Sequence, residues 1–251
     1  MSEATAIVLA AGRGTRMKSE LPKVLFPALG RPMLHWVLDS LKSAGITRSI
    51  VVVGYRADLV KDSLSDRDDV QFALQEEQLG TGHAVEMCRS QLEGQSGPVM
   101  VVAGDSPLIQ PSSVKTVLSE YHAGDWACLL GTLKKDDPTG LGRIVRGDDG
   151  RFERIVEQKD ASTAEQAIQE VNMSTYMFNN ADLLWALSQL SNENAQGEYY
   201  LTDCPEILRK AGKNVDALPV LQPCESLSIN TPDELALVEE KMKEMGYQAS
   251  T

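Results

Sequence analysis

The chain has 251 residues, 42% hydrophobic and 24% charged, a balance typical of a globular protein with a sizeable core. No apolar run approaches the roughly 18 residues of a membrane span, and no export signal opens the chain, so we expect a cytoplasmic protein that binds no membrane. The net charge of −12 opposes binding to nucleic acid, because the field of the whole molecule repels phosphates.

Strands and helices alternate through the first half of the chain. Strands are expected at the short apolar runs 5–10, 49–54, 70–74, 98–105 and 127–133. Helices are expected between them, at 32–45, 56–64, 82–92 and 111–122. The first of these helices is marked most clearly, by Pro32 at its start, one apolar stripe, and Gly45 at its end. This alternation predicts an α/β fold built on a mostly parallel, doubly wound sheet.

The pattern changes after Lys135. Two alternating strands around an Asp-Asp-Gly turn predict a hairpin within residues 142–157. A further strand and two helices are expected at 172–178, 180–190 and 231–246. We predict one domain over the whole chain, with three portions at 1–135, 136–230 and 231–251.

Cysteines and histidines give no sign of a zinc site or of a disulfide framework. The four cysteines lie 40, 76 and 20 positions apart without a CxxC pair, and the three histidines are equally scattered. We therefore expect reduced thiols.

The stretch IVLAAGRGTRMKSELPKVL, which begins at Ile7, gathers positive charge in this acidic chain. Gly12 and Gly14 follow a predicted strand, where glycine lets the backbone approach a ligand and present N–H groups to an anion. The dinucleotide fingerprint and the Walker loop both fail, because Met17 stands where each requires glycine. The loop suits a triphosphate bound by nearby basic side chains, although a plain glycine turn with solvated charges explains the same residues equally well.

The same stretch resembles the nucleoside-diphosphate-sugar pyrophosphorylases, whose pattern LAAGxGTRMxSxxPKVL it matches from Leu9 to Leu25. Five later segments extend the resemblance: LQEEQLGTGHAV, GDSPL, DDPTGLGRI, IVEQKDA and NAQGEYYLTD. The sequence is most similar to the uridylyltransferase half of the bifunctional N-acetylglucosamine-1-phosphate uridylyltransferases. This resemblance implies a Rossmann-like nucleotide-diphospho-sugar transferase fold, with a nucleotide-binding portion at 1–135 and a small β-rich sugar-binding portion at 136–230.

The implied reaction is Mg²⁺-dependent transfer of UMP from UTP to N-acetylglucosamine 1-phosphate, which gives UDP-N-acetylglucosamine and pyrophosphate. By resemblance, the uracil and ribose are bound by Leu9, Ala10, Ala11, Gly12, Gln75, Gly80 and Thr81, and further substrate-binding residues are Gly14, Ala103 and Gly104. Arg16 and Lys23 would contact the phosphates as catalytic residues. A glutamine amide such as that of Gln75 can pair with one edge of uracil, although a polar residue that merely closes a strand is the ordinary alternative.

The resemblance also implies a sugar site and a metal site. The sugar positions are Gly142, Glu157, Asn172, Tyr200 and Thr202. Asp105, a catalytic residue, and Asn230 would hold Mg²⁺, which prefers oxygen ligands and a shell partly completed by substrate. From the residues alone, Asp105 also fits a turn before Ser-Pro, and Asn230 lies just ahead of a helix with Thr231 as its N-cap and Pro232 at its first position.

Two departures from the family pattern bear on specificity. The usual Asn-Thr-Gly is Asn172-Met173-Ser174 here, and the usual Tyr-Gly-Asp is Ala103-Gly104-Asp105. The added side chains are expected to reshape the sugar pocket, so glucose 1-phosphate as acceptor and dTTP as donor stay open as alternatives. A non-catalytic nucleotide-sugar sensor also stays open, although the metal and phosphate residues are all present. The sequence shows no hexapeptide repeat and sets no oligomeric state.

Overall fold

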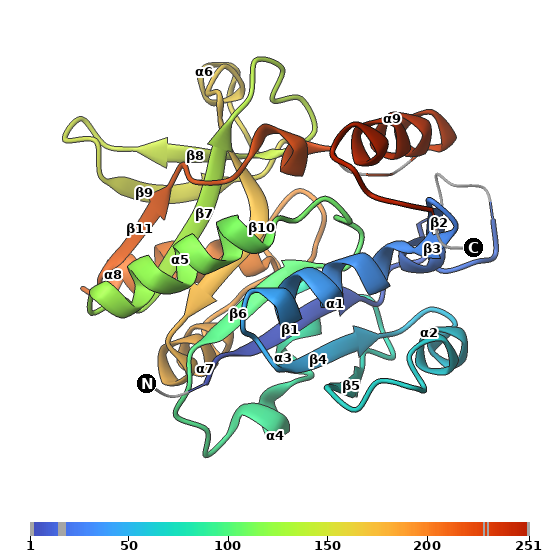
Figure 1. The fold of residues 1–251 in the computed structure, drawn as a ribbon. Helices are drawn as coiled ribbons and strands as arrows, with labels where there is room; N and C mark the ends of the chain where they lie inside the picture. The colour runs from blue at the N-terminus through green and yellow to red at the C-terminus, as the bar shows by residue number, and fades with distance from the viewer. Residues whose placement is uncertain (1–2, 15–18, 228, 230, 250–251) are drawn as a thin grey trace.

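The computed structural model describes residues 3–14, 19–227, 229 and 231–249. At its centre, these residues form a nine-stranded mixed sheet (Figure 1). The main path runs in the order β11-β7-β10-β6-β1-β4-β5. Its strands are β1 Thr5–Ala10, β4 Arg48–Val53, β5 Val70–Leu74, β6 Val99–Ala103, β7 Cys128–Lys134, β10 Glu170–Phe178 and β11 Val215–Leu218.

Strand β10 runs antiparallel to both of its neighbours, β6 and β7. The other neighbouring pairs along the path are parallel. The prediction of a mostly parallel α/β sheet is therefore confirmed, with one reversed strand inside it. Because β1 and β6 are parallel neighbours, the loops that follow them leave the sheet at the same edge.

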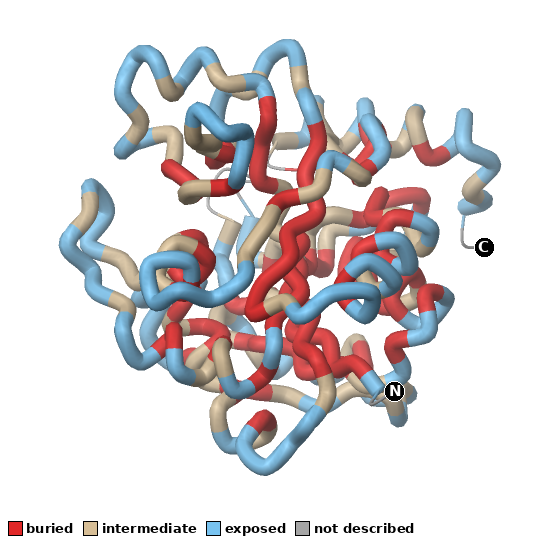
Figure 2. Tube along the Cα trace, turned by 90° about the vertical axis from the view of Figure 1, so that its left-hand side faces the viewer, coloured by how far each residue is buried: buried red, intermediate tan, exposed pale blue. Residues whose placement is uncertain are grey.

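Helices cover both faces of the sheet, and the pleat of the strands explains how. Ala6 and Val8 of β1 face a cluster that includes residues of α1 and α5, whereas Ile7 faces a second cluster with residues of α3, α7 and α8. The helices of these two layers are α1 Met33–Ser43, α5 Pro111–Ala123, α3 Thr81–Glu86, α7 Asn180–Leu187 and α8 Cys204–Lys210. Figure 2 shows the result, with buried backbone running through the middle of the molecule.

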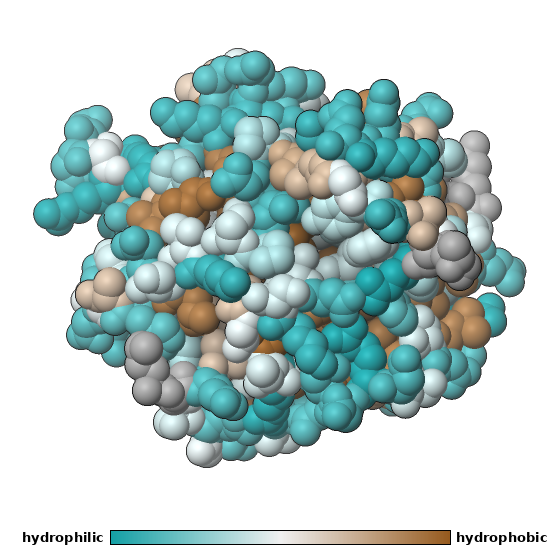
Figure 3. Space-filling view, in the orientation of Figure 1, coloured by the Kyte–Doolittle hydropathy of each residue, from teal (hydrophilic) through white to brown (hydrophobic). Residues whose placement is uncertain are grey.

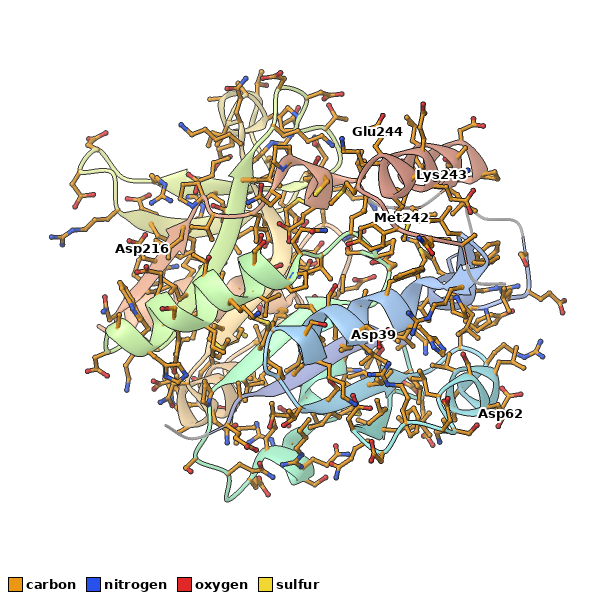
Figure 4. All side chains as sticks on the ribbon, in the orientation of Figure 1. Asp39, Asp62, Asp216, Met242, Lys243 and Glu244 are labelled. Atoms are coloured by element: carbon orange, nitrogen blue, oxygen red, sulfur yellow. The ribbon has the colours of Figure 1, made fainter. Side chains whose placement is uncertain are left out.

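Four further α-helices complete the set in the described residues. Their bounds are α2 Ala57–Ser63, α4 Arg89–Leu92, α6 Thr163–Gln166 and α9 Pro232–Glu244. Two of them, α2 and α4, pack Val60 and Leu92 into the same two clusters. Helix α9 packs Val238 and Met242 into a third cluster with Leu29 and Met33 (Figure 4 labels Met242). Thr231 is its N-cap, as predicted, and forms a capping box with Glu234.

The predicted hairpin is present as β8 and β9, and it extends the sheet beyond β10. Its strands are β8 Gly142–Arg146 and β9 Phe152–Val156. Arg146 ties this part together, because its guanidinium contacts Glu170 of β10 at 2.7 Å and Asp216 of β11 at 3.3 Å (Figure 4 labels Asp216). The division of the chain into three portions stays a prediction.

Several elements differ from those predicted. The single helix expected at 82–92 is two short ones, because the Cys88 N–H turns to the carbonyl of Val85 at 2.9 Å and tightens the chain between α3 and α4. The prediction contained neither α6, α8 nor β11, and it missed the small hairpin of β2 Pro27–Ala28 and β3 Arg31–Pro32. These pieces are too short to show a period.

None of the helices in the described part of the chain is long and apolar enough to cross a bilayer. The four cysteines are free and buried, in agreement with the expected reduced thiols. Hydrophilic side chains dominate the face drawn in Figure 3, with separate apolar patches between them.

Strand β10 carries an irregularity that reaches the candidate site. The pairing of β10 with β7 shifts between Asn172 and Thr175, so Met173 and Ser174 bulge out of register. Ser174 has a φ of 52°, in the left-handed region that glycine adopts freely and other residues adopt at a cost. The glycine usual at this point in the resembled family suits that backbone, and the serine of this chain strains it.

Ser174→Gly is expected to raise the free energy of unfolding by about 1 kcal/mol, because the left-handed backbone then carries no side-chain penalty. The matched control is Ser49→Gly, in the buried and regular strand β4, where glycine should lower stability by about 1 kcal/mol. Urea unfolding measures both. Destabilisation by both glycines alike would contradict the strain at Ser174.

Candidate active site

A cavity of about 310 Å³ opens at the edge of the sheet where β1 and β6 end. Eleven of the residues predicted from sequence line it: Leu9, Ala10, Ala11, Gly12, Gly14, Lys23, Gln75, Gly80, Thr81, Ala103 and Asp105. They come from segments that are nearly 100 positions apart in the chain, and the parallel register of β1 and β6, with Leu9 opposite Ala103, brings two of those segments together.

Five lining residues were not predicted as site residues: Val24, Gln78, Ala84, Ser174 and Glu198. Four of them, Val24, Gln78, Ala84 and Glu198, lie inside three of the segments that carry the family resemblance, so the motifs themselves were the available signal. Ser174 was expected only to reshape the sugar pocket, and it lines this cavity because the bulge in β10 carries it there.

Among the described residues, three charged side chains line the cavity, Lys23, Asp105 and Glu198, and two of them form an ion pair. Lys23 Nζ lies 2.5 Å from Asp105 Oδ2, and the two side chains are only 14% and 26% exposed. Lys23 opens a single 3₁₀ turn, Lys23–Leu25, directly after Pro22. Asp105 follows β6, at the end where open α/β sheets bind their ligands. In a partly buried site each charge of this pair compensates the other, so neither is buried without a counter-charge.

Two glycines make this arrangement possible. Gly14 has a φ of 67°, and a Cβ on it would lie 2.5 Å from Lys23 Cβ. Gly104 donates its N–H to the carbonyl of Leu9 at 2.9 Å, and a Cβ there would lie 2.9 Å from that oxygen. Gly104 is not among the residues that line the cavity. Its close contact with Leu9 instead brings the neighbouring Asp105 near the glycine loop.

The amide of Gln75 forms another part of the lining. Gln75 is 3% exposed, and its Nε2 donates to the carbonyl of Gly80 at 3.0 Å. The same nitrogen lies 3.0 Å from His83 Nδ1, a contact that the sequence analysis did not anticipate. Gly80 is tightly enclosed, because a Cβ on it would lie 2.5 Å from the carbonyl oxygen of Tyr199.

The residues predicted for a sugar lie beside the cavity and not in its lining. Thr202 Oγ1 donates to Glu157 Oε1 at 3.1 Å, and a Cβ on Gly142 would lie 3.7 Å from the same oxygen. Asn172 Nδ2 donates to the Tyr176 hydroxyl at 2.6 Å, while its Oδ1 accepts from the backbone N–H of Ser174. Ser174 therefore connects this group to the cavity.

Tyr200, the remaining predicted sugar residue, is buried, and its hydroxyl accepts from Gln196 Nε2 at 2.8 Å.

Several acidic side chains lie around the predicted sugar residues. Burial raises the pKa of Glu157, and the carboxylates of Asp160 and Glu198 raise it further. Burial, with Glu206 next, raises the pKa of Asp203 to about 6.

Two of the predicted site residues, Arg16 for the phosphates and Asn230 for the metal, lie outside the described residues. No group of three metal-binding side chains occurs in the part of the chain that the structure describes. The Asp105 carboxylate lines the cavity and is a hard oxygen donor, which fits a divalent cation held mostly by water and substrate oxygens.

Comparison with known sequences identifies the family of the chain and several curated relatives. Residues 6–194 match the family described as MobA-like NTP transferase domain. The bifunctional protein GlmU of an Exiguobacterium species is 48% identical over 235 residues, which are 94% of this chain and 51% of the relative. GlmU of Limosilactobacillus fermentum is 48% identical over 236 residues, again 94% and 51%. The chain thus spans about half the length of the curated relatives it matches.

Solved structures support the fold. A UDP-glucose pyrophosphorylase in its apo form has a TM-score of 0.79 at 16% identity, covering 98% of this chain and 99% of that one. A putative glucose-1-phosphate thymidylyltransferase from Bacillus anthracis has a TM-score of 0.77 at 18% identity, covering 97% of each chain. The predicted nucleotide-diphospho-sugar transferase fold is therefore confirmed.

Gly14→Ala is expected to lower the free energy of unfolding by about 1–3 kcal/mol, because the new Cβ meets both a left-handed backbone and the Lys23 side chain. Gly12→Ala is the matched control in the same loop, since a Cβ there has nothing within 4 Å. Chemical denaturation of the two variants tests the difference, and equal losses would show that the loop does not pack as described.

Asp203→Asn is expected to stabilise the protein at pH 7.5 by about 1–3 kcal/mol. The folded pKa of Asp203 is about 6 against an ordinary 3.8, so the folded state holds the proton more tightly and loses stability as pH rises between those values. An uncharged asparagine avoids that loss, and its advantage should vanish below about pH 4.

Denaturant titrations from pH 4 to 8 measure this difference, with Asp68→Asn, on an exposed aspartate, as the control. A gain for Asp203→Asn that stays constant across that range would contradict the raised pKa.

Proposed function

The chain belongs to the MobA-like NTP transferase family, and from that premise we propose that it transfers UMP from UTP to N-acetylglucosamine 1-phosphate, releasing UDP-N-acetylglucosamine and pyrophosphate. The observation that carries the proposal is the cavity in which a glycine loop, the Gln75 amide and the Lys23–Asp105 ion pair meet. The choice of nucleotide and sugar is supported by the likeness to GlmU proteins over 94% of this chain.

The chemistry needs positioning and charge neutralisation more than a covalent nucleophile. A phosphate oxygen of the sugar 1-phosphate attacks the α-phosphorus of UTP, the bond to the β-phosphate bridging oxygen breaks, and pyrophosphate leaves. Both reactants are anions and the chain itself has a net charge of −12, so local cations must offset their repulsion. Lys23 is the cation that the described lining of the cavity supplies, and Arg16 is the second by family resemblance.

We infer that the divalent ion is Mg²⁺, held by Asp105 with Asn230 as the second ligand that the resemblance implies. When bound, the ion supplies positive charge at the phosphates. Lys23 has three N–H donors, so it can bind a phosphate oxygen while it stays near a carboxylate. The backbone of Gly12 and Gly14 can approach the same phosphates closely, because neither residue has a side chain.

The sugar is assigned to the group that contains Glu157, Asn172 and Thr202. Glu157 accepts from Thr202 at 3.1 Å and is half-buried, so it can also accept from a sugar hydroxyl. A second candidate acceptor is another sugar 1-phosphate such as glucose 1-phosphate, and Ser174 in the cavity lining is the observation that favours it. We place the reaction in the cytoplasm, which agrees with four free, buried cysteines.

Lys23→Ala and Asp105→Ala are each expected to lower kcat by about 100-fold or more, because each removes a charge that acts on the reacting phosphates. Lys115→Ala, on the exposed face of α5, is the control and should keep full activity. Pyrophosphate release measured with a panel of nucleoside triphosphates and sugar 1-phosphates gives the rates. The panel also identifies the pair of substrates that this chain prefers.

Near wild-type turnover in either variant would refute the assignment of the site. UDP-sugar binding without turnover on any pair of the panel, in the presence of Mg²⁺, would instead identify a nucleotide-sugar sensor.

Removal of divalent ions with a chelator should abolish turnover, and activity that survives it would contradict the metal assignment.

A further inference from the structure

We propose that His83 selects the nucleobase by fixing the side-chain amide of Gln75, so that the cavity presents a hydrogen-bond acceptor to the ring N–H of uracil. His83 lines a neighbouring pocket and not the cavity itself, which makes it a positioning residue. The inference deepens the proposed function and rests on it, because it takes the ligand of the cavity to be a nucleotide.

Gln75 is held in place by its own backbone. It follows β5 directly, and its N–H donates to the carbonyl of Val53 in β4 at 2.8 Å. Its carbonyl accepts from Gln78 Nε2 at 3.1 Å. These contacts fix the main chain of Gln75, and only 3% of the residue is exposed. What remains is the orientation of the terminal amide, that is, which side carries the NH₂ group and which the oxygen.

Two contacts set that rotation. The carbonyl oxygen of Gly80 can only accept, so the Gln75 atom that lies 3.0 Å from it must be the NH₂ group. The second hydrogen of this NH₂ group is directed at His83 Nδ1, also at 3.0 Å. Nδ1 must then offer its lone pair, which places the ring N–H of His83 on Nε2.

Both amide hydrogens of Gln75 are therefore used within the protein. Its Oε1 accepts no hydrogen bond from the described residues, and Gln75 lines the cavity. To a ligand, Gln75 is thus an acceptor without a donor. Rotation of the amide by half a turn would place Oε1 against the Gly80 carbonyl, and it would also require the His83 ring to move its proton from Nε2 to Nδ1.

An acceptor of this kind distinguishes pyrimidine bases. Uracil and thymine carry a hydrogen on N3, which Oε1 can accept. Cytosine has a lone pair at N3, and a buried site that pairs with an N–H rejects an analogue that lacks it, because its own polar group is left unpaired. The arrangement therefore favours UTP and dTTP over CTP and is indifferent to the methyl group of thymine.

His83 is placed to hold this geometry by the start of helix α3. Gly80 is the N-cap of the helix, and its carbonyl accepts from the Ala84 N–H at 3.1 Å as well as from Gln75. One short turn of helix thus carries both acceptors that restrain the amide. Without the imidazole, one of the two restraints is lost, and the amide can turn its NH₂ toward the N3 lone pair of cytosine.

The test compares the affinities of UTP and CTP by isothermal titration calorimetry in three variants of the full chain. We expect the wild type to bind UTP about 100-fold more tightly than CTP, and His83→Leu to lower that ratio about tenfold or more. His83→Asn restores an acceptor for the amide and should keep most of the discrimination. His122→Leu, on the exposed end of α5, is the matched control and should leave the ratio unchanged.

His83→Phe keeps the volume of the ring without its acceptor, and it serves as the second variant should His83→Leu not fold. A UTP/CTP ratio that stays at the wild-type value in both the Leu and Phe variants would overturn the inference. The KM of the sugar 1-phosphate should stay within about twofold in every variant, because the contact concerns the base alone.

Failure of the inference is distinguishable from failure of the proposed function. If the wild type binds UTP and forms a UDP-sugar while the variants keep their discrimination, the proposed function stands and the role of His83 falls. If the wild type binds no nucleoside triphosphate, both fall together.

Discussion

The ion pair between Lys23 and Asp105 is the interaction on which the proposed chemistry depends. The two residues are 82 positions apart, and they meet at 2.5 Å because the loops after β1 and β6 leave the sheet at one edge. The chain carries a net charge of −12, so a phosphate ligand finds local attraction only where such a cation is exposed to it. Before substrate binds, Asp105 compensates the charge of Lys23. The pair thus keeps a buried cation stable until an anionic ligand arrives.

The rest of the site is arranged around this pair by tight backbone contacts. Gly14 and Gly104 allow the glycine loop, Lys23 and the end of β6 to approach within distances that a side chain would prevent. Gln75 reaches the same cavity from the end of β5, which β1 and β4 separate from β6. The β10 bulge brings Ser174 into the lining and joins it to Asn172. The ion pair, the Gln75 amide and Ser174, which contacts a residue assigned to the sugar, therefore all lie at one edge of the sheet.

Much of this could be predicted from the sequence, for reasons visible in particular residues. The apolar runs of β1, β4 and β6 are long enough to show strands, and glycines after β1 indicate a close backbone approach. Strand β11 has four residues and depends on pairing with β7, so its sequence alone gives no signal. The contact of Gln75 with His83 depends on how α3 begins, and the left-handed Ser174 depends on a register shift between strands. Such tertiary features leave no periodic pattern.

The most direct test of the central claim is a crystal structure of the chain with UTP and Mg²⁺. The account predicts the uracil ring against the Gln75 amide, with the triphosphate along the glycine loop and a phosphate oxygen within hydrogen-bond distance of Lys23 Nζ. Nucleotide bound elsewhere, with the cavity empty and the Lys23–Asp105 pair as it stands, would contradict it.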